Sequence, residues 1–521
     1  MSANPVAAAA GVAGRGAATP EARGRAWGES RRELALAIAG AVAIVVIRSI
    51  VPMVYERFDF NSDQAIVGLM AKHLSELKTF PLFFYGQNYM LGVASWIAAP
   101  FILVGGTSIA MLRLPLVIIG VAAALLCMLA FVRQGMRPML ALAATLPIIA
   151  TTPIVSATLL ELGASIEPFL YVMLLWWLRR RPYIFGALLC VAILHREFAM
   201  FAATSIAIVQ WRDRSWSTPA ALKAAASFVA VWVLIDALKR TVNNYGPAGG
   251  LHESASLTLE AKQIAMWLSF EVRPYLARLM SVVTKGLPDL FGARTHLIGR
   301  YGLISTIDAG SLLAGAAFAA ALLVCLWRLA QRAVRSGAGF ASDERFSFPL
   351  YLALIGLQTF LVYGLNGGIV AAAPTIILRF VLFLLLVPVA LLGAFFFHES
   401  SARWRGTVVA LIGVWALMTV ADNARLFREF LVSPPRNNYR ELTDYLVEHR
   451  IKYARAIYWD CYVITFLSDE RVIVAATDRF RIGSYQTRVE ANAANAARLR
   501  RLPCTTGKVV STWCVEDPFN R

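Results

Sequence analysis

Few residues of this sequence are charged, few are cysteine, and several common catalytic motifs are missing from it. Only 16% of the 521 residues carry a charge, whereas 58% are hydrophobic, and the mean hydropathy is +0.61. This composition excludes an ordinary soluble globular protein. The chain also lacks a Gly-rich nucleotide loop, a GxSxG elbow and an HExxH helix, so nucleotide-dependent chemistry and hydrolase triads have no support.

Cysteine is scarce and is not arranged as a metal site. No CxxC pair and no Cys/His cluster has metal-ligand spacing, which argues against structural zinc. In the polar C-terminal region, Cys504 and Cys514 are expected to pair if that region faces an oxidising compartment, with Cys461 as the competing partner. The other three cysteines lie in apolar runs, where we expect small core residues: Cys127, Cys190 and Cys325.

Acidic residues are outnumbered, 32 against 50 Lys and Arg, which leaves a formal charge of +18. Much of the excess lies in short connectors between apolar runs, such as residues 179–182 and 211–214. This is the positive-inside pattern of membrane proteins, so both connectors are predicted to be cytoplasmic. Membrane topology and anionic membrane lipids explain the charge, and no nucleic acid is expected as a partner.

Long apolar runs dominate the rest of the sequence. Several approach or exceed the roughly 20 residues that span a bilayer, beginning with residues 33–54. We therefore predict an α-helical polytopic membrane protein with about 10–13 membrane helices. Residues 1–32 are predicted to be a disordered basic cytoplasmic tail, and residues 33–422 the transmembrane domain.

The last hundred residues differ in kind from the apolar runs. An amphipathic helix is expected at 439–449, and β-rich runs follow at 453–459, 464–467 and 471–475. Residues 423–521 are therefore predicted to form a small α/β extracytoplasmic domain.

Residues 90–132 pose a topological difficulty. Hydropathy alone favours two crossings, but an outward Asp63 with inward basic turns at 133 and 179 requires one net crossing. Either one half of the segment is re-entrant or interfacial, or the turn at 133 faces outward. Arg113 within this segment is expected to be cytoplasmic and structural.

The most specifically patterned stretch near the membrane is 58–90, which reads FDFNSDQAIVGLMAKHLSELKTFPLFFYGQNYM. Asn61 or Ser62 can cap a helix whose first turn contains Asp63. Apolar residues recur at helical spacing and leave Lys72 off the stripe, so the pattern predicts an amphipathic helix lying in the membrane interface. An ordinary amphipathic connector would show the same pattern.

Three segments carry a resemblance: SDQAIVGLMAKH, FPLFFYGQNYM and MLRLPLVIIG (residues 111–120). Together they resemble the GT-C superfamily of polyprenyl-phosphate-sugar glycosyltransferases. The likeness is to family 39-like bacterial members related to protein mannosyltransferases and aminoarabinose transferases. It implies transfer of a sugar from a polyprenyl-phosphate donor to a lipid, glycan or protein acceptor on the extracytoplasmic face of a bacterial plasma membrane.

The resemblance also implies a catalytic carboxylate after the first membrane helix, which Asp63 matches. As a general base, Asp63 would accept the proton of the acceptor hydroxyl. The family commonly has a glutamate in the next position, where this chain has Gln64. Because no second carboxylate nucleophile is evident, inversion at the anomeric carbon is expected.

Glu161 is the candidate for a second acidic site residue that GT-C enzymes often carry in the next major outward loop. A solvated loop glutamate is the competing interpretation. Whether a metal takes part is open: Asp63 and Glu161 are the expected ligands if a divalent cation is used, and basic residues alone could suffice.

Four basic residues are candidates for binding the carrier phosphate. His195 and Arg196 interrupt an apolar hairpin, where they could instead form an internal network. Arg379 resembles the Arg-aromatic start of a late membrane helix in family 39-like enzymes, although an arginine there could simply snorkel to the interface. Lys72, more than two turns beyond Asp63 on the expected helix, either reaches the phosphate or only solvates the helix.

Three residues of the aromatic and amide-rich loop are predicted to contact the acceptor or the sugar: Tyr85, Gln87 and Asn88. A long outward loop at 239–308 is expected to cover the site. Two other kinds of protein remain as alternatives, a transporter or lipid flippase and a non-catalytic scaffold of GT-C type. No internal repeat of the transporter kind is found.

Overall fold

The structure of the protein is a computed structural model. The structure describes residues 20–56, 60–87, 90–163, 165–241, 271–292, 294–299, 302–336, 343–365, 377–504 and 506–517. Helix α1 (Pro20–Val54) is already helical at Pro20, so residues 20–32, which the sequence assigned to a disordered tail, extend the first membrane helix.

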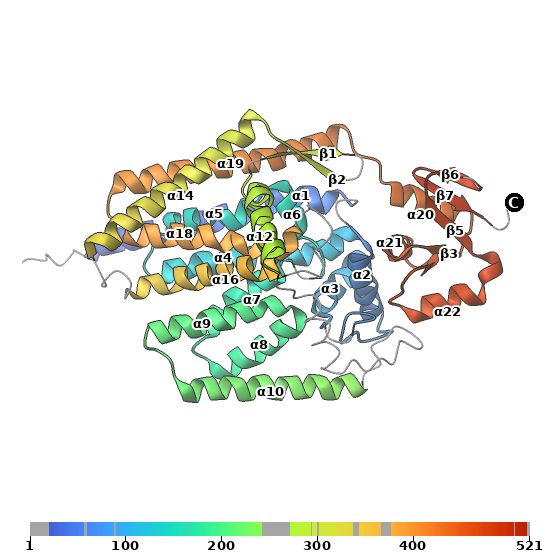
Figure 1. Cartoon of the computed structure of the whole chain (residues 1–521), viewed down its shortest axis with the longest axis horizontal. Coiled ribbons are helices and arrows are strands. Elements are labelled where there is room, and N and C mark those ends of the chain that lie inside the picture. Colours follow the sequence, from blue (N-terminus) through green and yellow to red (C-terminus); the bar gives the residue numbers. More distant parts are fainter. Residues whose placement is uncertain are drawn as a thin grey trace, which may run out of the picture.

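A body of roughly aligned helices forms the larger part of the molecule (Figure 1). Within the described residues, six helices are long and apolar enough to cross a membrane, and shorter apolar helices pack among them, so the chain is a polytopic membrane protein. The body begins with α1, α3 (Val93–Gly105), α4 (Ile109–Arg133), α5 (Pro138–Ile149), α6 (Pro153–Leu159), α7 (Glu167–Leu178), α8 (Pro182–His195), η1 (Glu197–Ala199), α9 (Met200–Arg212) and α10 (Thr218–Thr241).

The second half of the body follows residues 242–270, which lie outside the described part. It consists of α12 (Val272–Ser281), the π-helical η2 (Val282–Gly286), α13 (Leu287–Leu290), β1 (Thr295–Gly299), β2 (Gly302–Thr306), α14 (Ala309–Ser336), η3 (Glu344–Phe346), α16 (Ser347–Leu365), η4 (Leu378–Phe380), η5 (Leu382–Leu385), α18 (Leu386–His398) and α19 (Ala402–Val432). The predicted loop at 239–308 therefore contains helices and an antiparallel β1–β2 hairpin in its described part.

One membrane helix is broken close to the candidate site. Helices α5 and α6 meet at an angle of 84°, and the break falls at residues 150–152. The Arg48 guanidinium donates to the carbonyl of Ile148 and to the hydroxyl of Thr151, both at 2.8 Å, and Asn423 donates to the carbonyl of Thr151 at 3.1 Å. These buried donors satisfy the polar groups that the break exposes, as a non-helical segment at membrane depth requires.

The segment at 90–132 resolves into a short helix and a long one. Helix α4 has 25 residues and the length of a membrane span, whereas α3 has 13 and packs on α2 (Ser62–Ser75). Within this segment only α4 has the length of a membrane crossing, and the side that the turn at 133 faces stays a prediction. Arg113 is buried and donates to the carbonyl of Pro52, at the end of α1 that leads to Asp63. Arg113 and Asp63 therefore lie at the same end of the membrane body, and the predictions that place them on opposite faces of the membrane cannot both hold.

The C-terminal part is a small α/β unit beyond α19. Its five strands have the order β4-β3-β5-β7-β6, in which β3 is parallel to both β4 and β5. Cys504 and Cys514 form a disulfide, as the sequence predicts. The elements are α20 (Asn438–Glu448), β3 (Tyr453–Ala456), α21 (Tyr458–Leu467), β4 (Ile473–Ala476), α22 (Gly483–Ala491), η6 (Ala493–Asn495), β5 (Ala497–Arg501), β6 (Lys508–Val510) and β7 (Trp513–Glu516).

One β-rich run of the sequence is helical. Residues 464–467 belong to α21, not to a strand. Every residue of α21 except the exposed Trp459 is buried, so its outward side has no polar stripe to distinguish it from a buried strand.

Helix α21 lies directly on α2, so that the C-terminal unit covers the first connector of the membrane body (Figure 1). Gly68 of α2 allows this close approach. A Cβ at position 68 would lie 2.6 Å from the Phe466 ring and 2.8 Å from Leu112, which is closer than side chains pack. Helix α2 is consequently enclosed, and does not have the solvated polar face that the sequence predicts for it.

Candidate functional site

The candidate site begins at the N-terminus of α2. The Asn61 side chain accepts a hydrogen bond from the backbone N–H of Gln64 at 3.2 Å, which is the predicted cap. Asp63 is half-buried in the first turn, and its Oδ1 accepts a hydrogen bond from the hydroxyl of Tyr458 in α21. Asp63 therefore lies at the junction of the membrane body and the C-terminal unit.

Gln64 connects this junction to the segment that contains Glu161. Its side-chain oxygen accepts from the backbone N–H of Leu162 at 3.3 Å. The two acidic candidates, 98 positions apart in the chain, thus lie on segments that touch each other. A hydrogen-bonded amide therefore occupies position 64, where the resemblance implies a second carboxylate.

Arg196 lies behind the Glu161 segment. Its Nη2 is 3.4 Å from the position that a Cβ on Gly163 would occupy, and the guanidinium interacts electrostatically with buried Glu167. Gly163 has a φ of +95°, a conformation that favours glycine, and this turn leaves room for the guanidinium. His195 is buried and its Nδ1 lies 2.9 Å from the hydroxyl of Tyr171, which is not a member of the His195-Arg196-Glu197 network considered as its alternative.

Arg379 reaches the same neighbourhood from a distant part of the chain. It is exposed in η4, where its guanidinium lies 5.0 Å from the ring centre of Phe380. That ring is 6.0 Å from the ring of Phe198 in η1, two residues after Arg196, and η4 also contacts α6. The segments that carry Arg196 and Arg379 are therefore neighbours.

Lys72 has protein partners instead of an open position. Its ammonium lies 2.7 Å from Glu470, 3.3 Å from Asp469 and 3.4 Å from Glu76. Burial opposes the charge of Lys72, but the hydrogen bond to Glu470 and the three carboxylates together raise its pKa. Lys72 thus joins α2 to the C-terminal unit, and its part in phosphate binding stays a prediction.

Glu470 gathers the other groups of this contact. Its carboxylate lies 3.2 Å from His73 Nε2 and accepts from the hydroxyl of Tyr485 at 2.7 Å. Burial alone would raise the pKa of Glu470, but hydrogen bonds from His73, Lys72 and Tyr485 hold it well below its usual value. We call the set Lys72, His73, Glu470 and Tyr485 the domain clamp.

The predicted acceptor residues differ in their surroundings. Tyr85 is buried, and its hydroxyl lies 3.0 Å from His73 Nδ1 and 2.9 Å from Thr79, so it extends the domain clamp. Gln87 is partly exposed beside Gly86, whose carbonyl accepts from Arg481 at 2.9 Å. Asn88 lies outside the described residues.

Residues of the C-terminal unit at this site were missed by sequence reasoning. Tyr458 and Arg481 follow β3 and β4, and the carboxyl ends of parallel strands meet at one edge of a sheet, where ligands bind in α/β proteins. Arg479 lies 5.0 Å from the ring centre of Tyr458 and 5.9 Å from that of the exposed Trp459. Only the sheet order reveals which edge of the C-terminal unit lies against Asp63.

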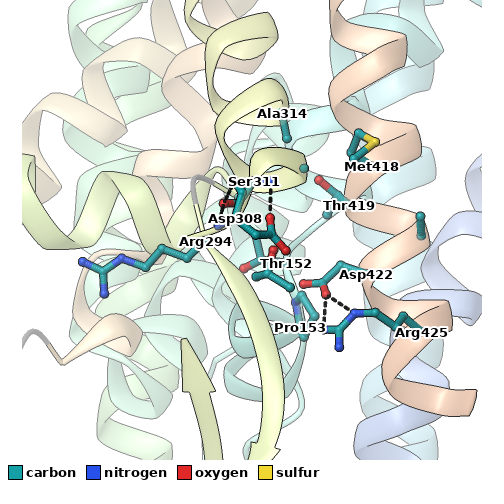
Figure 2. Close-up of a pocket in the computed structure, with 14 residues that line it drawn as sticks. Thr152, Pro153, Arg294, Asp308, Ser311, Ala314, Met418, Thr419, Asp422 and Arg425 are labelled. Carbon is teal, nitrogen blue, oxygen red and sulfur yellow. Dashed lines mark hydrogen bonds and ion pairs between the residues drawn. The ribbon is translucent and has the colours of Figure 1, made fainter. Parts of the chain in front are cut away.

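A pocket of about 180 Å³ lies at the other end of α6 from Glu161, between α14, α19 and the hairpin (Figure 2). Its charged groups have protein partners: Arg425 contacts Asp422 at 2.6 Å, Asp308 accepts from the N–H of Ser311 at 2.7 Å, and Arg294 lies 3.4 Å from Asp289. None of the predicted site residues lines it. Over the described ranges, no group of three or more His, Cys, Asp or Glu side chains is placed to hold a metal ion.

The chain thus combines a polytopic helical membrane body with a small α/β unit that lies over α2. No protein-family model and no curated protein matches the sequence. Among solved structures, ArnT from Cupriavidus metallidurans bound to undecaprenyl phosphate matches with a TM-score of 0.58 and 9% identity, over 93% of this chain and 97% of that one. ArnT in the apo state matches with a TM-score of 0.43 and 11% identity, over 95% and 98%.

ArnT is a GT-C aminoarabinose transferase. The likeness over nearly the whole of both chains shows that this chain has the GT-C fold, as the sequence predicts.

Proposed function

We propose that this protein is a membrane glycosyltransferase that moves a sugar from a polyprenyl-phosphate carrier to an acceptor hydroxyl at the extracytoplasmic face. The observation that carries the proposal is the placement of Asp63 next to the segment of Glu161, which Gln64 joins to α2 and against which Arg196 lies. A carboxylate on one side and guanidinium groups on the other suit transfer from a phosphate leaving group to a hydroxyl.

Asp63 is the general base of the proposed reaction. Its Oδ1 accepts from Tyr458, and its Oδ2 has no hydrogen-bond partner among the described residues. Oδ2 takes the proton of the acceptor hydroxyl as that oxygen attacks the anomeric carbon in line with the departing phosphate. A single displacement inverts the anomeric configuration.

Arg196 and Arg379 stabilise the departing carrier phosphate. Guanidinium groups match the geometry of phosphate oxygens, and their effect is large in a poorly hydrated site. The carrier named in the matched ArnT structure, undecaprenyl phosphate, has the chemistry that this pair of arginines suits.

The face at which the reaction occurs is proposed from three observations. The basic connectors at 179–182 and 211–214 lie at helix ends, the C-terminal unit lies on the Asp63 side, and that unit contains a disulfide. Together they favour a cytoplasmic position for the connectors and an extracytoplasmic one for Asp63.

The test is transfer from undecaprenyl-phosphate sugars by purified protein, wild type against Asp63→Asn. Turnover should fall by roughly 10²–10⁴-fold, because the substitution keeps the size of the side chain but removes the base. Binding of undecaprenyl phosphate should change little. Glu490→Gln, at an exposed carboxylate of the same C-terminal unit, is the control. Near-normal turnover in Asp63→Asn, with an active wild type, would remove Asp63 from the mechanism.

A further inference from the structure

We propose that Tyr458 of the C-terminal unit is a positioning residue for Asp63, so that this unit forms one wall of the reaction site. The inference rests on the proposed function, in which Asp63 is the base. It assigns a part in the reaction to a domain that no sequence feature connected with Asp63.

Two hydrogen bonds join the segments, in opposite directions. The Tyr458 hydroxyl donates to Oδ1 of Asp63, and the Ser62 hydroxyl donates to the backbone carbonyl of Tyr458. The partners are 395 and 396 residues apart in the chain. Two successive residues of α2 are therefore bonded to one residue of α21. This double contact fixes the position of the Tyr458 hydroxyl relative to the Asp63 carboxylate.

Tyr458 is itself held in one orientation. Its side chain is buried, and its backbone N–H donates to Asp478 at 2.7 Å. Its ring makes edge contacts with Trp459 and Tyr462, at centroid distances of 5.2 and 5.7 Å. A hydroxyl on a ring packed in this way loses little conformational entropy when it binds a carboxylate, which makes it suited to orient one.

The close packing of the two helices keeps this geometry. The Phe60 and Phe466 ring centres are 5.6 Å apart beside Asp63, and the absence of a side chain at Gly68 lets α21 approach α2. The domain clamp holds the same two segments further along α2. The hydroxyl consequently cannot leave Asp63 unless the C-terminal unit moves as a whole.

Toward Asp63, the Tyr458 hydroxyl can act only as a hydrogen-bond donor. Burial, together with the charge of Asp63 and the hydrogen bond to it, raises the pKa of the phenol well above its usual value. The hydroxyl therefore keeps its proton while Asp63 works, and the single proton occupies Oδ1. Oδ2 is left to face the acceptor.

Other charged groups face this pair from several elements. Arg481 lies against the Tyr458 hydroxyl, Arg479 covers the Tyr458 ring, and Asp478 caps its backbone. Glu161 lies on the segment joined to Gln64, and Lys72 with its carboxylates lies further along α2. Because all of these remain in a Tyr458→Phe variant, the difference from wild type isolates the hydroxyl.

The experiment compares Tyr458→Phe with Tyr462→Phe. Tyr462 lies in the same helix, and its hydroxyl accepts from the backbone N–H groups of Arg481 and Ile482 at 2.6 and 3.1 Å. Tyr458→Phe should lower turnover about 10- to 100-fold, with undecaprenyl phosphate binding unchanged.

Tyr462→Phe removes buried hydrogen bonds as well and is expected to lower stability, but it should leave turnover near that of the wild type. A structural role for Tyr458 alone would give Tyr458→Phe the same behaviour. Near-normal turnover in Tyr458→Phe therefore overturns the proposal.

A second measurement separates this proposal from the proposed function. Infrared spectra of each protein minus its Asp63→Asn counterpart report the carboxylate stretching bands of Asp63 without any substrate. Tyr458→Phe should shift these bands, because Oδ1 loses a hydrogen-bond donor, and Tyr462→Phe should not. If this shift occurs although Asp63→Asn retains turnover, the contact stands and the proposed function fails. If the bands stay at the wild-type positions, the contact does not act on Asp63 and the inference is wrong.

Discussion

The four basic side chains proposed for the carrier phosphate have different surroundings. Lys72 has three carboxylates around its ammonium, and buried His195 lies against Tyr171. Arg379 is exposed, and its segment lies beside that of Arg196 through the rings of Phe380 and Phe198. The two arginines are therefore the groups on which we base the prediction of phosphate binding.

Replacement of Arg379 by alanine should weaken the binding of undecaprenyl phosphate by about 10- to 100-fold, the range for a lost hydrogen bond to a charged group. The rate should fall as well, because the phosphate is charged in the ground state and in the transition state. Arg403→Ala is the matched control, since Arg403 is also exposed but lies at the start of α19, the end remote from the C-terminal unit. Binding to protein in nanodiscs measures the effect, and equal affinities in the two variants would contradict it.

Glu161→Gln tests whether a divalent cation is shared with Asp63. If it is, the variant should lose activity, raised divalent metal should restore part of it, and a chelator should inactivate the wild type. If the reaction needs only basic residues, neither metal nor chelator should change the rate. Glu167→Gln would not serve as the control, because that carboxylate is buried beside Arg196. The control is Glu490→Gln, since Glu490 is exposed on α22.

Among the elements, α2 and α21 depend on each other most. Helix α2 carries Lys72 and His73, and the turn after α21 supplies Glu470, so each element brings a charge that would be costly to bury alone. The lowered pKa of Glu470 implies stability that is present above the usual glutamate range and is lost as pH falls. The raised pKa of Lys72 implies stability that is present below the usual lysine range and is lost only as pH rises beyond it.

Glu470→Gln should therefore destabilise the contact by about 1.5–3 kcal/mol near neutral pH. The contribution of Glu470 to the thermal stability of the wild type should be constant between about pH 5 and 10 and should decrease below about pH 4. The variant should lack that acid-dependent part. Glu490→Gln again is the control, and an identical acid dependence in wild type and Glu470→Gln would exclude the domain clamp as its source.

At the scale of the whole molecule, the proposed orientation puts the C-terminal unit outside the cell. A Thr487→Cys label should react with an impermeant thiol reagent in intact cells, whereas Ser215→Cys, beside the basic connector at 211–214, should react only after lysis. Both positions are exposed. The native cysteines should give little background, because four are buried and two form the disulfide. The reverse pattern would invert the topology.

The sequence by itself determined the local features of this protein: the membrane helices, the cap at Asn61, the place of Asp63 in the first turn of α2, and the pairing of Cys504 with Cys514. Each follows from apolar length, capping chemistry or short separation, which neighbouring residues express directly. The GT-C fold was indicated by three short segments, and the match over nearly the whole chain confirms it.

Only the tertiary structure decided which distant groups meet. That Glu470 reaches Lys72, that Tyr458 reaches Asp63 and that Arg196 lies beside Gly163 depend on contacts between segments with no shared local pattern. The end of the membrane body at which Arg113 lies, and the helical state of residues 464–467, were likewise set by packing. Hydropathy reports whether a side chain is buried; the partner that it is buried against is determined by how the helices and the sheet pack.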